Sequence, residues 1–231
     1  MTPNADLARQ LEALLALKVP PVGLVFSDAP LPGIARVATP APAGCGYWKR
    51  AGRGEMFYTI GADHLGCAIG AHTHGVDLTA DDKKNLTDTI GMMIGAGYLS
   101  ESEVPQIPHR TSKLDVLTYG PLARLPREAD VVLVRATPRA AMLLAEATHA
   151  AGVRSERPSV IRPACAMVPD VLATRRAATS FGCIGNRVYT ELPDDEVWWT
   201  LVGGDLPAVL AQVVTLVEAN LKLESFHRAR A

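Results

Sequence analysis

The chain has 231 residues, of which 48% are hydrophobic and 20% are charged. This composition excludes an intrinsically disordered protein and a fibrous repeat, and the length suits one domain or two small, tightly packed ones. The 23 basic and 24 acidic residues give a net charge of −1. This balance argues against a general nucleic-acid-binding protein, because such a protein carries a basic excess.

No apolar run approaches the length of about 18 residues that a membrane-spanning helix needs. The N-terminal segment Met1–Asp6 lacks the order of a secretory signal, in which basic residues precede apolar ones. We therefore expect a soluble cytoplasmic protein without a membrane or nucleic-acid partner.

Apolar periodicity and capping residues predict the elements of the first half. The first element is a helix capped by Asn4 and ended by Val19–Pro21, and a buried strand over 22–26 follows it. A proline-rich loop over 28–42 leads to a strand over 56–60. A helix then runs from the capping box of Thr79 and Asp82 to about Gly95 or Gly97, before an extended loop over 105–108.

The second half predicts four strands and two helices. The strands cover 114–119, 130–136, 177–181 and 196–202, and the helices run from Thr137 to about Gly152 and from Asp205 along an apolar stripe to Leu221. Residues Val131–Val134 are a continuous apolar run, which is typical of a central strand. In the pair Trp198 and Trp199, strand alternation sends one ring inward and one outward, and core packing is the expected role of the pair.

These elements predict a mixed α/β (α+β) fold: a single compact domain over residues 1–231, with a mixed sheet and flanking helices. A faint repeat relates two halves, roughly 19–110 and 114–220. Each half has an apolar strand, a cysteine after proline and small residues, a second strand, and a second cysteine in a glycine-rich turn. We expect the halves to pack about a pseudo-twofold axis that brings equivalent cysteines together.

The four cysteines are the most informative residues, although a free cysteine is often only a small buried hydrophobe. Without an export signal, metal or redox chemistry is favoured over disulfides. The turns Gly66–Gly70 and Gly182–Gly185 can aim backbone N–H groups at thiolates or at cluster sulfides. No C-x2-C pair of a zinc ribbon is present. The pattern therefore predicts a [4Fe–4S] cluster, or a related metal site, on Cys45, Cys67, Cys165 and Cys183.

Histidines gather around the second cysteine: His64, His72 and His74 lie within eleven residues. His72 and His74 are candidates for a catalytic proton donor beside a cluster, or for direct ligands; the alternative is a solvated polar loop. Arg187 follows Cys183 by four residues, as Lys49 follows Cys45. We expect the Arg187 guanidinium to point toward the cysteines, where it would offset negative charge or hold an anionic substrate.

The chain resembles the family called domain of unknown function 169, whose members occur in archaea and bacteria. The segments that carry the resemblance are Val19–Val22, Cys45–Ala51, Gly54–Tyr58, Gly66–Gly75, Tyr119–Leu122, Asp130–Val134, Cys165 and Gly182–Arg187. The resemblance implies one compact domain in which the four cysteine segments are important. It implies no reaction.

Three functions are compatible with these residues. The first is a cysteine-ligated iron–sulfur protein that transfers electrons when all four thiolates bind iron, or acts on a small anion when one iron is open. The second is a metal-free small-molecule binding protein with Tyr47, Trp48, the histidines and Arg187 around a pocket. The third is a thiol enzyme with Cys67 or Cys183 as nucleophile and His72 or His74 as base. A small molecule or a redox protein is the expected partner, and a homo-oligomer is compatible with all three.

Overall fold

An open sheet of six strands forms the centre of the protein, whose computed structural model describes residues 3–154 and 163–230. The strands are β1 (Val22–Ser27), β2 (Phe57–Ile60), β3 (Val116–Pro121), β4 (Val131–Ala136), β5 (Ala178–Ser180) and β6 (Val197–Val202). They lie in the order β2-β3-β1-β4-β6-β5, and all neighbouring strands are antiparallel.

The prediction of a mixed sheet is wrong, because every pair of named strands is antiparallel. The apolar run in β4 has another cause. Val131 and Leu133 pack into the core on one face of the sheet, while Val132 and Val134 pack into the core on the other. Both faces are covered, so an antiparallel strand here is apolar throughout.

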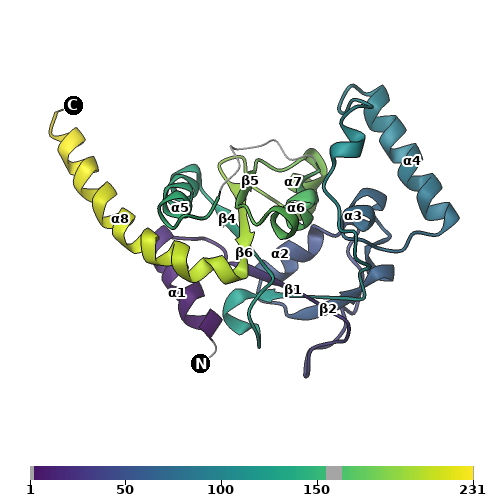
Figure 1. Ribbon diagram of the computed structural model, residues 1–231, viewed down its shortest axis with the longest axis horizontal. Helices are drawn as coiled ribbons and strands as arrows, with labels where there is room; N and C mark the ends of the chain where they lie inside the picture. The colour runs from purple at the N-terminus through teal and green to yellow at the C-terminus, as the bar shows by residue number, and fades with distance from the viewer. Residues whose placement is uncertain (1–2, 155–162, 231) are drawn as a thin grey trace.

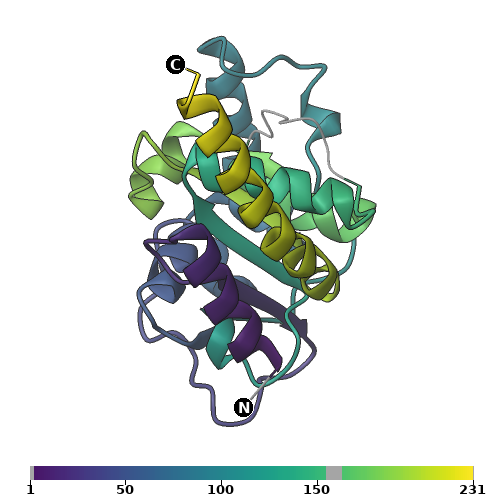
Figure 2. The same ribbon diagram turned by 90° about the vertical axis from the view of Figure 1, so that its left-hand side faces the viewer.

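Helices lie on both faces of the sheet. On one face, α2 (Gly46–Gly52) and α6 (Met167–Thr174) pack into the core, α7 (Ile184–Thr190) lies against α2, and α3 (Ala68–Thr73) lies against the turn η4 (Ala164–Ala166). On the other face lie α1 (Pro3–Leu15), α5 (Pro138–Ala150) and α8 (Leu206–Arg228). Figure 2 shows α1 and α8 crossing this second face.

The remaining helix, α4 (Ala80–Gly95), buries no side chain and extends away from the sheet (Figure 1). Short 3-10 turns complete the described chain: η1 (Gly61–His64), η2 (Val104–Gln106), η3 (Leu122–Arg124) and η5 (Gly203–Asp205). The turn η2 replaces part of the extended loop predicted over 105–108.

The capping predictions are partly confirmed. Thr79 and Asp82 form the predicted capping box of α4, and the Thr137 hydroxyl caps α5. Asn4 is not a cap, because α1 already begins at Pro3; its amide donates to the carbonyl of Arg127 at 2.6 Å and ties α1 to a distant loop. The Asp205 carboxylate pairs with Arg175 at 3.2 Å instead of capping α8.

The two tryptophans of β6 do alternate, but neither is exposed. Trp198 packs into the core on the α2 and α6 face, and Trp199 into the core on the α1 and α8 face. Core packing is thus confirmed for both rings, and the outward ring is buried as well because helices cover both faces.

Helix α8 is the one helix within residues 3–154 and 163–230 that has the length and hydropathy of a membrane-crossing segment. Its first half, however, belongs to the protein core. Leu206, Val209, Leu210 and Val213 are buried beside α5 and α1. The first half of the predicted apolar stripe therefore packs against α1 and α5.

The strand order reads the same from both ends of the sheet. One half runs β1-α2-β2-α3-α4-β3, and the other runs β4-α5-α6-β5-α7-β6. The two halves share the order strand-helix-strand-helix-strand once α4 and α5, which occupy different places, are set aside. This is the order expected of two repeats related by an axis between β1 and β4. The boundaries 19–110 and 114–220 stay a prediction.

Candidate cysteine site

Each cysteine lies where the chain enters a short helix on the same face of the sheet. Cys45, Cys67 and Cys183 immediately precede α2, α3 and α7, while Cys165 lies in η4, which leads into α6. The helix start expected at Cys165 is thus present. The other three helices are not predicted from the sequence, because they have only six or seven residues and contain glycine.

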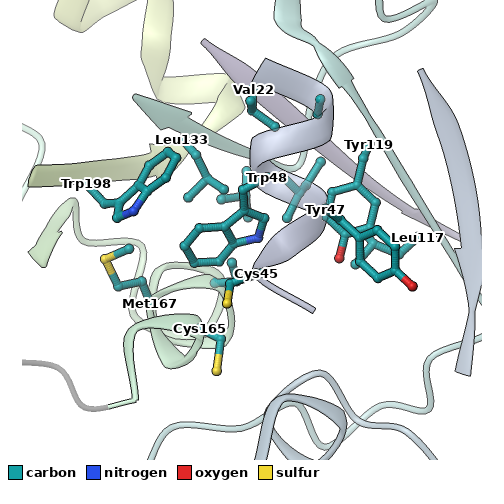
Figure 3. Close-up of a cluster of buried hydrophobic side chains, with 14 of the residues drawn as sticks. Val22, Cys45, Tyr47, Trp48, Leu117, Tyr119, Leu133, Cys165, Met167 and Trp198 are labelled. Atoms are coloured by element: carbon teal, nitrogen blue, oxygen red, sulfur yellow. The ribbon is translucent and has the colours of Figure 1, made fainter. Parts of the chain in front are cut away.

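The structure brings the four thiols together. Cys45 and Cys165 lie in one buried core, Cys67 packs against that core, and α7, which follows Cys183, lies against α2, which follows Cys45. A negative charge on any of the other three thiols would therefore disfavour a negative charge on Cys45. Figure 3 shows the sulfur atoms of Cys45 and Cys165 beneath the ring of Trp48. Two thiols are buried, Cys45 and Cys165, and two are half-buried, Cys67 and Cys183.

Glycine places the second segment against the first. A Cβ atom on Gly66 would lie 2.8 Å from the carbonyl oxygen of Pro42, closer than real Cβ atoms come. Only glycine therefore lets the turn before Cys67 touch the loop before Cys45.

Backbone N–H groups point at both half-buried thiols. Gly70 donates to Sγ of Cys67 at 3.4 Å, and Asn186 donates to Sγ of Cys183 at 3.5 Å. Each thiol thereby takes the N-cap position of its helix. The backbone at the two glycine-rich turns therefore directs N–H groups at the thiols, as the sequence predicts.

Each half also supplies a polar side chain to the first cysteine of the other half. The Thr73 hydroxyl, at the end of α3, lies 3.4 Å from Sγ of Cys165. The Asn186 side chain, in α7, faces the Cys45 thiol, and its Oδ1 accepts the indole N–H of Trp198 at 3.0 Å. Sequence reasoning missed both residues, although their positions after Cys67 and Cys183 are the signal that could have indicated them.

Burial makes the inner thiols weak acids. It raises the pKa of Cys45 to about 12, charge on Cys183 and Cys67 adds to the rise, and Asn186 opposes it. Burial also raises the pKa of Cys165, and the Thr73 hydroxyl opposes that rise. Both groups are therefore neutral thiols at pH 7 unless a cation compensates for the loss of the proton.

No group of three His, Cys, Asp or Glu side chains within residues 3–154 and 163–230 has the geometry to hold a metal ion. Tetrahedral zinc requires its four sulfur ligands about 2.3 Å from one atom. The thiols therefore do not form a closed mononuclear site in this structure. A [4Fe–4S] cluster distributes its thiolates over separate iron atoms and needs a wider arrangement.

His64 is buried beside this site and has a defined tautomer. The Thr59 hydroxyl donates to the carbonyl of Leu117 at 3.1 Å and also lies 2.9 Å from Nε2 of His64. A hydroxyl has one proton, so Nε2 of His64 must be the donor to Thr59. Burial lowers the pKa of His64 to about 3, so Nδ1 is an unprotonated acceptor at neutral pH. Nδ1 faces Gly44, next to Cys45.

His74 is held in the same way. Its Nδ1 lies 2.9 Å from the carbonyl oxygen of Gly70, which can only accept, so Nδ1 carries the proton. Burial lowers the pKa of His74 to about 4, and Nε2 is therefore an unprotonated acceptor. The rings of His64 and His74 stack with centroids 5.5 Å apart. At neutral pH, Nε2 of His74 can therefore accept a hydrogen bond, and the role of His74 as a catalytic proton donor stays a prediction.

His72 lies outside this buried pair. It is half-buried, and its ring stacks on that of His109 with centroids 4.8 Å apart. Neither His72 nor His74 hydrogen-bonds a thiol within residues 3–154 and 163–230. The Cys–His contact that a thiol enzyme uses is absent from the described chain.

The core around the thiols contains polar atoms without a hydrogen-bond partner in the described residues. They are Nε1 of Trp48, Nδ1 of His64, Nε2 of His74, the hydroxyl of Tyr119 and Nδ2 of Asn186. Burial, and then charge on Tyr47, Cys45 and Cys165, raises the pKa of Tyr119, which keeps its phenol protonated. Buried polar atoms in proteins normally have partners, so this set is suited to hydrogen bonds with a bound group.

The cationic side chains near the cysteines in sequence are engaged elsewhere. Nη1 of Arg187 donates to the carbonyl of Pro193 at 2.9 Å, and Nζ of Lys49 pairs with Glu191 at 3.0 Å. Tyr47 and Trp48 are fully buried core residues. The hydroxyl of Tyr47 donates to the carbonyl of Asp63 at 2.6 Å.

Comparison with known proteins agrees with the sequence resemblance. No curated protein and no solved structure matches this chain. The model of the DUF169 family, described as "Uncharacterised ArCR", matches residues 10–212. This match includes the sheet, all four cysteines and the residues that contact them, and the chain therefore belongs to the DUF169 family.

Proposed function

We propose that Cys45, Cys67, Cys165 and Cys183 bind an iron–sulfur cluster of the [4Fe–4S] type. The observation that carries this proposal is that the four cysteine segments meet on one face of the sheet: Cys45 and Cys165 share one buried core with Cys67 packed against it, and α7, which follows Cys183, lies against α2. The backbone N–H groups of Gly70 and Asn186 support it, because hydrogen bonds to sulfur stabilise a cluster and tune its potential.

The acid–base state of the thiols is compatible with this proposal. Deprotonating Cys45 and Cys165 in the core is unfavourable while no cation is present. Iron ions would supply the compensating positive charge, and cluster binding would release the thiol protons. We therefore expect cluster uptake to improve as pH rises above neutrality.

Two uses of such a cluster follow from the number of thiolates that bind iron. With all four bound, the cluster would exchange electrons with a redox partner, and the partial exposure of Cys67 and Cys183 favours contact near α3 and α7. With three bound, the open iron would act on a small anion. The proposal places the protein in the cytoplasm, where reducing conditions keep thiols free.

Anaerobic reconstitution with iron and sulfide tests the proposal. We expect brown protein with about four iron and four sulfide ions per chain, and a broad visible absorption that dithionite bleaches. Replacing any one cysteine by serine should lower the iron content. Iron retained by a single variant would identify the cysteine that is not a ligand.

Met92→Leu is the matched control, because Met92 is an exposed sulfur-containing residue on α4, away from the sheet. It should bind as much iron as the wild type. Wild-type protein that stays colourless and free of iron would overturn the cluster proposal. Wild-type iron content in all four serine variants would also overturn it, since that iron could not be bound by these thiols.

A further inference from the structure

A surface hollow of about 440 Å³ lies between α6 and the loop of residues 109–112. Phe26, Arg110, Asp130, Pro169 and Leu172 are among the residues that line it. We propose that this hollow binds a small organic monocarboxylate and that Arg110 recognises its carboxylate group.

Arg110 offers an unused guanidinium. Its Cζ lies 3.9 Å from the centroid of the Phe26 ring, a stacking contact that fixes the plane of the group. Within residues 3–154 and 163–230 its side chain has no hydrogen bond and no ion pair. Arg36, by comparison, pairs with Asp63 at 2.8 Å. A half-buried, stacked guanidinium with free N–H groups suits two-pronged binding of a carboxylate.

The backbone holds Arg110 at this place. Its N–H donates to the carbonyl of Thr73 at 3.0 Å, and Leu114 donates to the carbonyl of Gly75 at 2.8 Å. Gly75 has φ of +76°, and a Cβ atom there would lie 2.3 Å from the carbonyl oxygen of Ser112. Glycine therefore allows the loop to cross the end of α3 closely enough to be bonded to it.

The other lining groups limit the kind of ligand. Oδ2 of Asp130 accepts the N–H of Phe26 at 2.7 Å, and its Oδ1 lies 3.6 Å from Nη2 of Arg127. The hydrogen bond and ion pair of Asp130 are thus made with groups other than Arg110, but its charge, like that of Asp115, also attracts the Arg110 guanidinium. The Asp130 charge disfavours a second negative charge in the hollow. Phe26, Pro169 and Leu172 provide apolar walls. A single carboxylate on an apolar body matches this combination.

The hollow adjoins the cysteine site. Thr73 binds the backbone of Arg110 through its carbonyl and approaches Cys165 through its hydroxyl. Helix α6, which provides Pro169 and Leu172, follows the turn that carries Cys165. The hollow can bind a carboxylate whether or not the cysteines hold a cluster. Only the further statement that this carboxylate is a substrate of the cluster rests on the proposed function.

Benzoate is a suitable probe, with benzamide as its neutral analogue of the same shape. Each is titrated into metal-free protein and followed by amide chemical shifts. We expect saturable binding of benzoate at residues 109–112 and α6, and much weaker binding of benzamide. Arg110→Gln should weaken benzoate binding about tenfold or more, the usual effect of losing a charge-assisted hydrogen bond.

A second position tests the charge dependence without altering Arg110. Ala173 is exposed on α6 and lines the hollow. Ala173→Asp should weaken benzoate binding, while the isosteric Ala173→Asn should leave it nearly unchanged. Absence of saturable benzoate binding, equal affinity for benzamide, or unchanged affinity in a folded Arg110→Gln variant would overturn the inference. Iron content is measured separately, so failure of the cluster proposal is distinguishable.

Discussion

The hydroxyl oxygen of Thr73 lies 3.4 Å from Sγ of Cys165, although 92 positions separate the two residues. The opposite exchange is made by Asn186, which faces Cys45 from the second half of the chain. The second cysteine helix of each half thus contacts the first cysteine of the other. Neither half can form the site alone.

Thr73→Val tests the first of these contacts. Valine has the shape of threonine but no hydroxyl, so the contacts of Oγ1 with Sγ of Cys165 and with the Gly70 carbonyl, which share one proton, are both lost. We expect the free energy of unfolding to fall by about 1 kcal/mol. The pKa of Cys165 should rise further, and reconstitution with iron should slow. Chemical denaturation and the time course of visible absorption measure the two effects.

Thr118→Val is the control for this experiment. Thr118 is also fully buried, but its hydroxyl has no hydrogen-bond partner in the described part of the chain. Removing it should leave stability unchanged or raise it slightly, because no bond is lost. If both valine variants lose the same stability, the hydroxyl of Thr73 has no specific role at Cys165.

Asn186→Asp tests the second contact. The carboxylate can still accept the indole N–H of Trp198, but it places negative charge where the amide faces Cys45. The pKa of Cys45 should rise, and iron retained after reconstitution should decrease. The same substitution at the exposed Asn85 of α4 should have no effect on iron content. Normal iron content in Asn186→Asp would show that Asn186 does not influence the thiol.

His74 predicts how the stability of metal-free protein depends on pH. Its pKa is about 4 in the folded chain and near its ordinary value of 6.5 in the unfolded chain. The unfolded chain therefore takes up this proton first as pH falls. The stabilisation is fully present above pH 6.5 and is lost between pH 6.5 and 4, at up to about 1.4 kcal/mol per pH unit.

His74→Gln should reduce this slope, as measured by denaturation at several pH values. At pH 7.5 both proteins are neutral at this position, so the difference there reports only altered packing. Equal slopes for wild type and variant between pH 6.5 and 4 would contradict the low pKa of His74.

The features that could be predicted from sequence are those with long repeated patterns. Apolar periodicity or an apolar run is enough to predict all six strands and the helices α1, α4, α5 and α8. The antiparallel sheet was not predicted, because burial of β4 on both faces gives the same apolar run as a parallel strand. The helices α3 and α7 were missed because a cysteine occupies the N-cap, which is usually a serine, threonine, aspartate or asparagine.

The site was predictable to a similar extent. Matched glycine–cysteine turns indicated the segments that meet. Arg187 is close to Cys183 in sequence, but its guanidinium donates to the carbonyl of Pro193 instead of to a thiol. Arg110 has no motif around it in the sequence. It reaches the site because Gly75 lets its loop cross α3, a long-range contact that no local pattern encodes.

Gly75→Ala tests that crossing directly, with Gly97→Ala as the matched control. Both glycines have positive φ, +76° and +69°, but only at Gly75 would the new Cβ meet another group, 2.3 Å from the carbonyl of Ser112. Gly97→Ala should cost about 1–2 kcal/mol, the strain of an alanine in the left-handed region. Gly75→Ala should lower the free energy of unfolding by clearly more, because residues 110–114 must also move.

Gly75→Ala should also weaken benzoate binding, whereas Gly97→Ala should not. Equal losses of stability, together with unchanged benzoate affinity in Gly75→Ala, would show that the close crossing at Gly75 does not position Arg110.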